Sequence, residues 1–337
     1  MKRLAVISMA GALLASASVA DAKTLKFQQS SNAGDWAHTY MVNATPLLET
    51  MTNGSLKIEA LPTKSVVPHR ETIDAVANGI LDGDFNAIAY FSGRDPAFAI
   101  MGDLIAGYDT PEQYQDYCMH GGGKEMLQKI YDTLMPNKIK VIGCGPYGKE
   151  AFVAKVPSYG VADLKGLKLR TPSQMSARAI KALGAVPVPM PITKLYNALA
   201  RGTVDGVLVS PTVLHTFKIK EVTRYFADGI PFGSSPMFVV MNKKSWNKLS
   251  PAHKDIVNKT VGKRWGTVGG KIYDTEHAKG MAFLAGSKAH NLIRLPDAEV
   301  RKASGLLNQL EKEVVQQWEK QGIPATEILK IMRAAGA

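Results

Sequence analysis

The sequence predicts an α/β fold with parallel sheets, and two observations lead to that expectation. Strand-like stretches of alternating apolar residues take turns with helix-like stretches along the chain, an order typical of parallel sheets covered by helices. The chain has 337 residues, of which 45% are hydrophobic and 21% are charged, as in an ordinary globular protein. That length is sufficient for two domains.

The first half of the chain supplies strands and helices in turn. Leu25 and Phe27 occupy alternate positions, as in a strand, and Gly54 closes a helix expected from about 36 to 50. The other elements expected in this half are strands at 55–61, 83–91 and 138–143 and helices at about 70–78 and within 112–133.

The second half continues the alternation and ends in helices. Ser173 is expected to cap a helix that ends at Leu183, because its side chain can accept a hydrogen bond from the first helical turn. Ser250 and Pro251 mark another helix start, after which the chain is expected to stay helical for about 35 residues, an unusual length for a globular domain. The other expected elements are strands at 151–156, 166–170, 185–189 and 203–210 and a helix at 194–202.

The N-terminal residues have the order of a secretory signal peptide. Lys2 and Arg3 precede an apolar, alanine-rich stretch, and small-x-small sites end at Ala20 and Ala22. We therefore expect residues 1–22 to be cleaved and the mature protein to be periplasmic. No later stretch approaches the 18 or so uninterrupted apolar residues of a membrane-spanning helix.

The formal net charge of +12 is spread along the chain without a dense run of lysine and arginine. Such a balance favours anionic partners by long-range attraction, but it is also typical of a solvated surface. A nucleic-acid-binding protein would carry a basic face on a recognisable module, which this sequence lacks. We therefore expect no nucleic-acid partner.

Three glycines, Gly143, Gly145 and Gly148, form the pattern G-x-G-x-x-G after an apolar run, as in dinucleotide-binding loops. Such a loop needs a helix that opens at the third glycine. Residues 149–157 instead have the pattern of a strand closed by a proline, so we interpret the glycines as a bend. Other catalytic motifs are missing and the seven histidines are not spaced as ligand pairs, so we expect no enzyme activity, no cofactor and no metal site.

Cys118 and Cys144 are the only cysteines of the chain. Export to an oxidising compartment would allow a disulfide between them. The sequence leaves the pairing open, because it does not show whether their Cα atoms come close enough.

Residues 162–206, ADLKGLKLRTPSQMSARAIKALGAVPVPMPITKLYNALARGTVDG, resemble the signature region of the TRAP-type periplasmic solute-binding proteins, the DctP-like receptors. Three motifs keep the order found in that family: the D-L-K-G-L-K run that leads to Arg170, the G-A-x-P-x-P-M motif and the R-G-x-V-D-G motif. The likeness extends from about Leu25 to the final helices, which is nearly all of the mature chain.

The resemblance implies a two-lobed Venus-flytrap fold with a ligand cleft between the lobes and a long helix spanning both. Lobe I is expected to contain residues 23–147 and 232–275, and lobe II residues 148–231 and 276–337. The CGPYG stretch at 144–148 would be the first crossing between lobes, where its glycines would allow a hinge motion. The family also implies a monomer that delivers its ligand to TRAP permease subunits in the membrane.

By the same resemblance, Arg170 anchors the carboxylate of the ligand. The chemistry agrees, because a planar guanidinium can donate two parallel hydrogen bonds to a carboxylate. Family members often carry a second basic residue where this chain has Glu150. A carboxylate there would orient Arg170 or accept a hydrogen bond from a ligand hydroxyl or ammonium group, and it would repel a second ligand carboxylate.

The remaining expected ligand contacts are matched by position in the family pattern. After the V-D-G motif the family commonly has polar residues, whereas this chain has Leu208 and Val209. The other matched positions are the aromatic residues Trp36, Tyr90 and Phe232, and three polar residues, Ser173, Gln174 and Ser210, are expected as further contacts.

One arginine among apolar and aromatic walls suits an aromatic or branched monocarboxylate, with or without a hydroxy or keto group. Two alternatives stay open at this point, a receptor for C4-dicarboxylates and an exported α/β enzyme acting on a carboxylate. A receptor that serves a sensor in place of a transporter is a further possibility.

Overall fold

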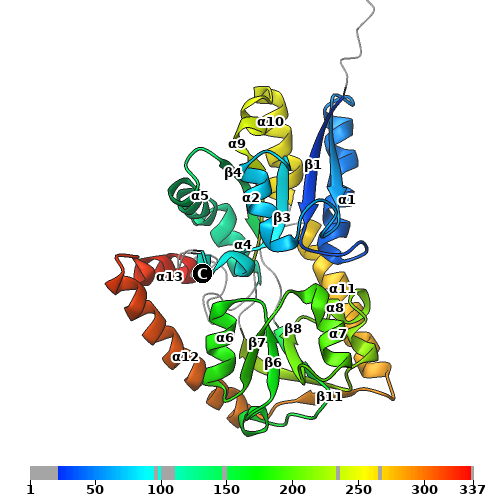
Figure 1. The fold of residues 1–337 in the computed structure, drawn as a ribbon, viewed down its shortest axis with the longest axis vertical. Helices are drawn as coiled ribbons and strands as arrows, with labels where there is room; N and C mark the ends of the chain where they lie inside the picture. The colour runs from blue at the N-terminus through cyan, green and yellow to red at the C-terminus, as the bar shows by residue number, and fades with distance from the viewer. Residues whose placement is uncertain are drawn as a thin grey trace, which may run out of the picture.

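Two β-sheets, each covered by helices, form two lobes (Figure 1), as expected for the two-lobed α/β architecture. The computed structural model describes residues 22–94, 98–99, 111–145, 150–232, 236–264 and 268–334. The expected signal peptide lies outside the described residues, apart from Ala22. Among the described helices, none is both long enough and apolar enough to cross a membrane.

The first lobe is built on a five-stranded sheet in the order β2-β1-β3-β10-β4. β1 is parallel to β2 and β3, whereas β10 is antiparallel to β3 and β4. Every residue of β10 is buried, as expected for a strand inside a sheet that is covered on both faces. The strands are β1 (Lys23–Gln29), β2 (Leu56–Leu61), β3 (Gly83–Ala87), β4 (Ile139–Gly145) and β10 (Met237–Asn242).

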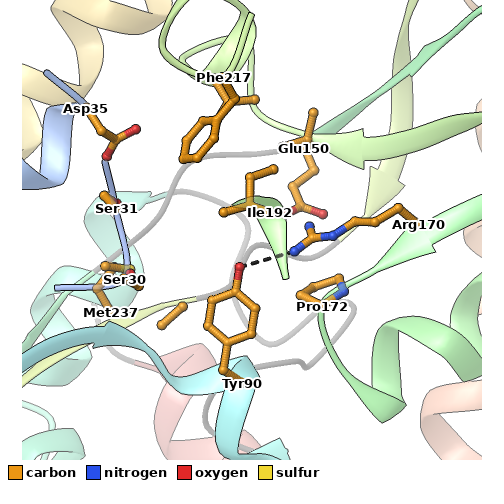
Figure 2. Close-up of a pocket in the computed structure, with 13 residues that line it drawn as sticks. Ser30, Ser31, Asp35, Tyr90, Glu150, Arg170, Pro172, Ile192, Phe217 and Met237 are labelled. Atoms are coloured by element: carbon orange, nitrogen blue, oxygen red, sulfur yellow. Dashed lines mark hydrogen bonds between the residues drawn. The ribbon is translucent and has the colours of Figure 1, made fainter. Parts of the chain in front are cut away.

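The strand expected at 83–91 is shorter in the structure. β3 ends at Ala87, and a 3-10 helix, η2 (Ile88–Phe91), follows it. The amide of Ile88 still donates to the carbonyl of Pro236, the residue before β10, and the residues after it close tight turns. This turn carries Tyr90 to the side of the first lobe that faces the second (Figure 2).

The helices of the first lobe begin and end close to the expected positions. α1 starts at Trp36 because the side chain of Asp35 accepts a hydrogen bond from the amide of Ala37, which satisfies one free donor of the first turn. The described helices around this sheet are α1 (Trp36–Met51), α2 (Thr72–Ala77), α4 (Pro111–Met119), α5 (Gly123–Leu134) and α9 (Lys243–Asn247).

The second lobe is built on a six-stranded sheet in the order β11-β9-β5-β8-β6-β7. β6 is parallel to β7 and β8, whereas β5 is antiparallel to β8 and β9. The strands are β5 (Glu150–Ala154), β6 (Lys168–Thr171), β7 (Val186–Pro189), β8 (Gly206–Val209), β9 (Tyr225–Phe232) and β11 (Asn291–Arg294). This lobe also contains the helices α6 (Gln174–Ala182), α7 (Leu195–Ala200) and α8 (Val213–Thr216).

The chain passes between the lobes next to the glycines of the G-x-G-x-x-G pattern. β4 of the first sheet ends at Gly145, and β5 of the second sheet begins at Glu150. A strand, not a helix, therefore follows the third glycine, in agreement with the interpretation as a bend. Gly148 and its neighbours 146–149 lie outside the described residues.

A long helical run follows Ser250, whose side chain caps it as expected. It consists of α10 (Pro251–Val257), a π-helical stretch at Asn258–Lys263 and α11 (Gly270–Gly286), with 265–267 outside the described part. Its first part packs against α1 and β4, and α11 continues to α8 and β11 of the other lobe. Gly262 allows this packing, because a Cβ atom there would lie 2.7 Å from the carbonyl oxygen of Ile142.

The C-terminal helices return from the second lobe toward the first. α12 (Asp297–Lys320) packs against α6 and β9, and α13 (Ala325–Ala334) contacts both α12 and α4 (Figure 1). The lobe boundaries expected from the sequence stay a prediction, and β9 of the second sheet extends one residue past the expected boundary, to Phe232.

The two cysteines are joined in the structure. A disulfide links Cys118 of α4 to Cys144 of β4, with the Cα atoms 5.6 Å apart. It lies two residues before the first segment that passes between the lobes, and it fastens α4 to the end of β4. The alternative that the sequence left open is thereby decided in favour of pairing.

Candidate functional site

A pocket lies where the two lobes meet, and both sheets contribute to its walls (Figure 2). Its cavity has a volume of about 50 Å³. The polar lining residues are Ser30, Ser31, Asp35, Tyr90, Glu150 and Arg170, and the apolar ones are Ala87, Pro172, Ile192, Val209, Val213, Phe217 and Met237. The first lobe provides the serines, Asp35, Ala87, Tyr90 and Met237, and the second lobe provides the others.

Arg170 is the one guanidinium among the described lining residues. It comes from β6 and is only 3% exposed. Its Nε donates to the carbonyl of Met190 at 2.9 Å, and its Nη2 donates to the hydroxyl of Tyr90 at 3.1 Å. These bonds use two of the five N–H donors of a guanidinium, so donors remain for a ligand.

Tyr90 reaches Arg170 from the other lobe and is itself held by two neighbours. Its ring meets the imidazole of His69 edge-on, with the centroids 4.0 Å apart. The guanidinium of Arg70 lies 5.8 Å from the centre of the same ring, and its Nη2 donates to the carbonyl of Pro172 at 3.1 Å. Two hydrogen bonds, from Arg170 and Arg70, therefore join the lobes beside the pocket.

The environment of His69 keeps it neutral. Burial is the main cause that lowers its pKa, to about 3, and the nearby charges of Arg70 and Arg170 add to the effect. An imidazolium beside two guanidinium groups would carry an additional repulsion. At neutral pH the positive charge of the site therefore lies on the arginines.

Two carboxylates share the pocket with Arg170. Glu150 is the first residue of β5 and is 7% exposed. Asp35 is 2% exposed, and burial is the main cause that raises its pKa to about 6. The hydrogen bonds from the amide of Ala37 and the hydroxyl of Ser31 oppose that rise. The pocket thus combines one cation with two acidic groups.

Four residues expected from the sequence lie together at this pocket, namely Arg170, Glu150, Tyr90 and Val209. Leu208 does not line it, because neighbouring residues of a strand face opposite sides of the sheet, and it packs into a different apolar cluster from Val209. Phe232 ends β9 opposite Glu150, but its side chain lies outside the described ones.

The other expected contacts lie away from the lining. Trp36 packs edge-on against Tyr273 of α11 with ring centroids 5.3 Å apart, and Ser210 shares a 2.7 Å hydrogen bond with the hydroxyl of that tyrosine. Ser173 caps α6 by accepting from the amide of Ser176, and Gln174 is exposed. None of these four side chains belongs to the lining of the pocket in this structure.

Several lining residues carry no signal in the sequence that points to a pocket. Asp35 is recognisable only as the residue before a helix, and Ser30 and Ser31 only as polar residues after a strand. Ile192 and Phe217 belong to short helical turns between strands, where apolar residues are ordinarily read as core. Within the described residues, no group of three or more His, Cys, Asp or Glu side chains could hold a metal ion.

Two α/β lobes with a polar pocket between them are the architecture of a solute-binding receptor. The family model of bacterial extracellular solute-binding proteins, family 7 (DctP), matches residues 27–321. The chain therefore belongs to this family. It is a periplasmic solute receptor of the TRAP type and not an enzyme, so the alternative of an exported enzyme is set aside.

Two characterised relatives illustrate the family. The chain is 28% identical to the 2,3-diketo-L-gulonate-binding periplasmic protein YiaO of Escherichia coli, over 72% of this chain and 73% of that protein. It is 27% identical to the sialic acid-binding periplasmic protein SiaP of Vibrio cholerae, over 85% and 87%.

Solved structures share the fold. A TRAP solute-binding protein of Rhodoferax ferrireducens in complex with copurified benzoate superposes with a TM-score of 0.82 at 22% identity, over 93% of this chain and 97% of the other. An open structure without ligand from Rhodobacter sphaeroides gives a TM-score of 0.67 at 26% identity, over 92% and 96%.

Proposed function

We propose that this receptor binds a monocarboxylate with a branched or aromatic body. The observation that carries the proposal is the composition of the described pocket lining, with one buried guanidinium, two acidic side chains and otherwise mostly apolar walls. Arg170 would bind the ligand carboxylate through N–H donors that its bonds to Met190 and Tyr90 leave available.

The walls favour a ligand with an apolar body. Ile192, Val209, Val213, Phe217 and Met237 surround the cavity with aliphatic and aromatic surface. Each ~100 Å² of ligand surface buried against them would contribute about 2.5 kcal/mol. Structural neighbours from other bacteria are described as complexes with benzoate and with both enantiomers of mandelate, which supports an acid of this type.

The two acidic side chains argue against a second carboxylate on the ligand. A second negative charge would lie near Glu150 or Asp35 in a poorly solvated space. Two like charges ~5 Å apart at an effective dielectric constant of ~20 repel by about 3 kcal/mol. A di- or tricarboxylate would therefore bind more weakly than the monocarboxylate of the same shape.

The cavity volume limits the size of the ligand body at this degree of closure. The cavity measures about 50 Å³, whereas a protein cavity that holds benzene has a volume of about 150 Å³. A short branched chain needs less space than a ring. An aromatic acid would need the lobes to close less far, or Phe217 or Met237 to rotate.

In the proposed transport cycle the ligand closes the receptor by touching both lobes. It would meet Arg170 and Glu150 on one side and Tyr90 and Asp35 on the other, and these contacts coexist only in the closed state. A ligand shifts the equilibrium by its differential affinity for that state. The closed monomer, exported by the signal peptide at 1–22, would then dock on the TRAP permease.

Substitution of Arg170 tests the proposal. We expect Arg170→Ala to weaken monocarboxylate binding at least 100-fold, about 2.7 kcal/mol, and Arg170→Lys to recover only part of it, because an ammonium cannot form the bidentate pair. Isothermal titration of the mature protein would measure this, with circular dichroism and thermal unfolding as checks of the fold. A folded Arg170→Ala protein with undiminished affinity would refute the role of Arg170.

A further inference from the structure

The segment from Ser30 to Asp35 forms a polar wall of the pocket that no expected ligand contact accounts for. It joins β1 to α1 in the first lobe. Ser30, Ser31 and Asp35 all line the pocket, and all three are buried. Figure 2 shows Asp35 and Ser31 on the opposite side of the pocket from Arg170, with Tyr90 between the two sides.

Asp35 has hydrogen-bonding capacity beyond what helix capping uses. Its Oδ1 accepts from the amide of Ala37 at 3.0 Å, and the hydroxyl of Ser31 also bonds to the carboxylate. A carboxylate offers about four acceptor positions. Two of these are thereby occupied, and the side chain faces a cavity in which further donors could be placed.

A second acidic side chain acts on the Asp35 carboxylate and adds to the effect of burial. Burial is the main cause of its raised pKa, and the charged side chain that acts on it is Glu276 of α11, a second carboxylate that raises the pKa further. Helix capping alone does not require this arrangement, because serine or asparagine caps a helix as well as aspartate does. A donor group on a ligand would stabilise the ionised carboxylate directly.

We propose that Asp35, with Ser31 beside it, is a second recognition site that selects ligands carrying a hydrogen-bond donor, a hydroxyl or an ammonium group, at the end away from the carboxylate. This inference rests on the proposed anchoring of the carboxylate by Arg170. The ligand would then be held at one end by the second lobe and at the other by the first, which couples recognition of its far end to closure.

Matched ligands separate this role from helix capping. The aromatic pair is phenylacetate and 3-hydroxyphenylacetate, and the aliphatic series is hexanoate, 6-hydroxyhexanoate and 6-aminohexanoate. Within each set only the donor changes. We expect the wild-type protein to bind the best donor-bearing acid of a set at least tenfold more tightly than the donor-free acid, measured by isothermal titration at pH 7.5.

Asp35→Asn and Asp35→Ser are the test variants, because both side chains can still cap α1. We expect both to reduce the preference for the hydroxyl-bearing acid to threefold or less, and the readout is this ratio of affinities, not the absolute affinity for either acid. Preference for the ammonium-bearing acid should fall furthest, since its interaction depends on the charge. A purely structural role of Asp35 would weaken all ligands equally and leave their ratio unchanged.

The outcomes distinguish this inference from the proposed function. Donor-free acids that bind the wild-type protein as tightly as donor-bearing ones, or a preference that both Asp35 variants retain, would overturn the role of Asp35 alone. Arg170→Ala should abolish binding of every acid in both sets. Failure of the wild-type protein to bind any of them would contradict the proposed function itself, and the inference with it.

Discussion

Burial of an ionised acidic residue in the first lobe lowers the free energy of unfolding, and the hydrogen bonds to that residue offset only part of the loss. Asp84 of β3 is fully buried, and its Oδ2 accepts from the hydroxyl of Thr72 at 2.6 Å and from the amide of Asn86 at 3.3 Å. Burial is the main cause that raises its pKa to about 7. The protonated form is therefore favoured in the folded state, and the ionised form is destabilising.

The sign of the pH effect follows from this shift. Because the folded pKa lies above the usual value of 3.8, the stability that protonated Asp84 contributes is fully present below pH 4 and is lost as the pH rises through about 7. His69 acts in the opposite sense, because its pKa is lowered to about 3 and its contribution is lost as the pH falls from 6.5 toward that value.

We therefore expect Asp84→Asn to raise the free energy of unfolding at pH 8 by about 2–4 kcal/mol, since the amide has no charge to desolvate. At pH 4 the same substitution should have little effect, because Asp84 is then already neutral. Urea unfolding at both pH values measures the difference. Equal effects at pH 4 and pH 8 would show that the charge of Asp84 is not the cause.

For single residues, the sequence indicates a pocket position where the residue type or a family motif is distinctive. It gives no such indication where only the folded arrangement brings an ordinary residue to the pocket. Arg170 is recognisable because it ends a strand within a family motif, and Glu150 because it replaces a residue that is usually basic. Asp35 is an ordinary helix cap in the sequence, and only the approach of the second lobe places it in a pocket. Trp36 and Ser210 have plausible chemistry, but both contact Tyr273, which is 237 residues from Trp36 and 63 residues from Ser210 in the chain. Local sequence patterns do not describe contacts over such separations.

Among the elements, strands and helices follow from local patterns, whereas their ends depend on tertiary contacts. The helix at 36–50 and the cap at Ser250 are predicted well, because apolar spacing and capping side chains act locally. The strand expected at 83–91 ends at Ala87, where the chain turns into a 3-10 helix beside the start of β10, a strand distant in sequence. The pairing of Cys118 with Cys144 likewise depends on how α4 packs beside β4.

Hydrogen bonds between elements of different lobes would stabilise the closed state relative to an open one. The hydrogen bond from Arg70, next to α2, to the carbonyl of Pro172, after β6, joins the two lobes beside the pocket and is partly buried. Its loss would remove about 0.5–1.5 kcal/mol from the closed form only. The open form would not be affected, because the two residues then lie on separate lobes.

We expect Arg70→Ala to accelerate ligand dissociation about three- to tenfold, with little change in the association rate. Stopped-flow fluorescence measures both rates. Arg94→Ala is the matched control, because Arg94 bonds to Asp74 within the first lobe and should leave dissociation unchanged. Equal effects of the two substitutions would refute a role of Arg70 in holding the lobes together.

For the whole molecule, the order of strands and helices predicts the α/β class, and the family motif at 162–206 predicts two lobes. Neither predicts how far the lobes close. The volume of the cavity and the hydrogen bonds between the lobes depend on side chains that meet only when both sheets are in place. For this reason Arg170 and Tyr90 could be placed at the pocket from the sequence, whereas Asp35, Ser30 and Ser31 could not.

The most direct test of a single-carboxylate pocket compares two acids that differ by one carboxylate. Isothermal titration of the mature wild-type protein at pH 7.5 with 3-methylbutanoate and 3-methylglutarate makes this comparison. Repulsion of about 3 kcal/mol from Glu150 or Asp35 predicts that the dicarboxylate binds roughly 100-fold more weakly. A dicarboxylate that binds as tightly as the monocarboxylate, or more tightly, would contradict the account.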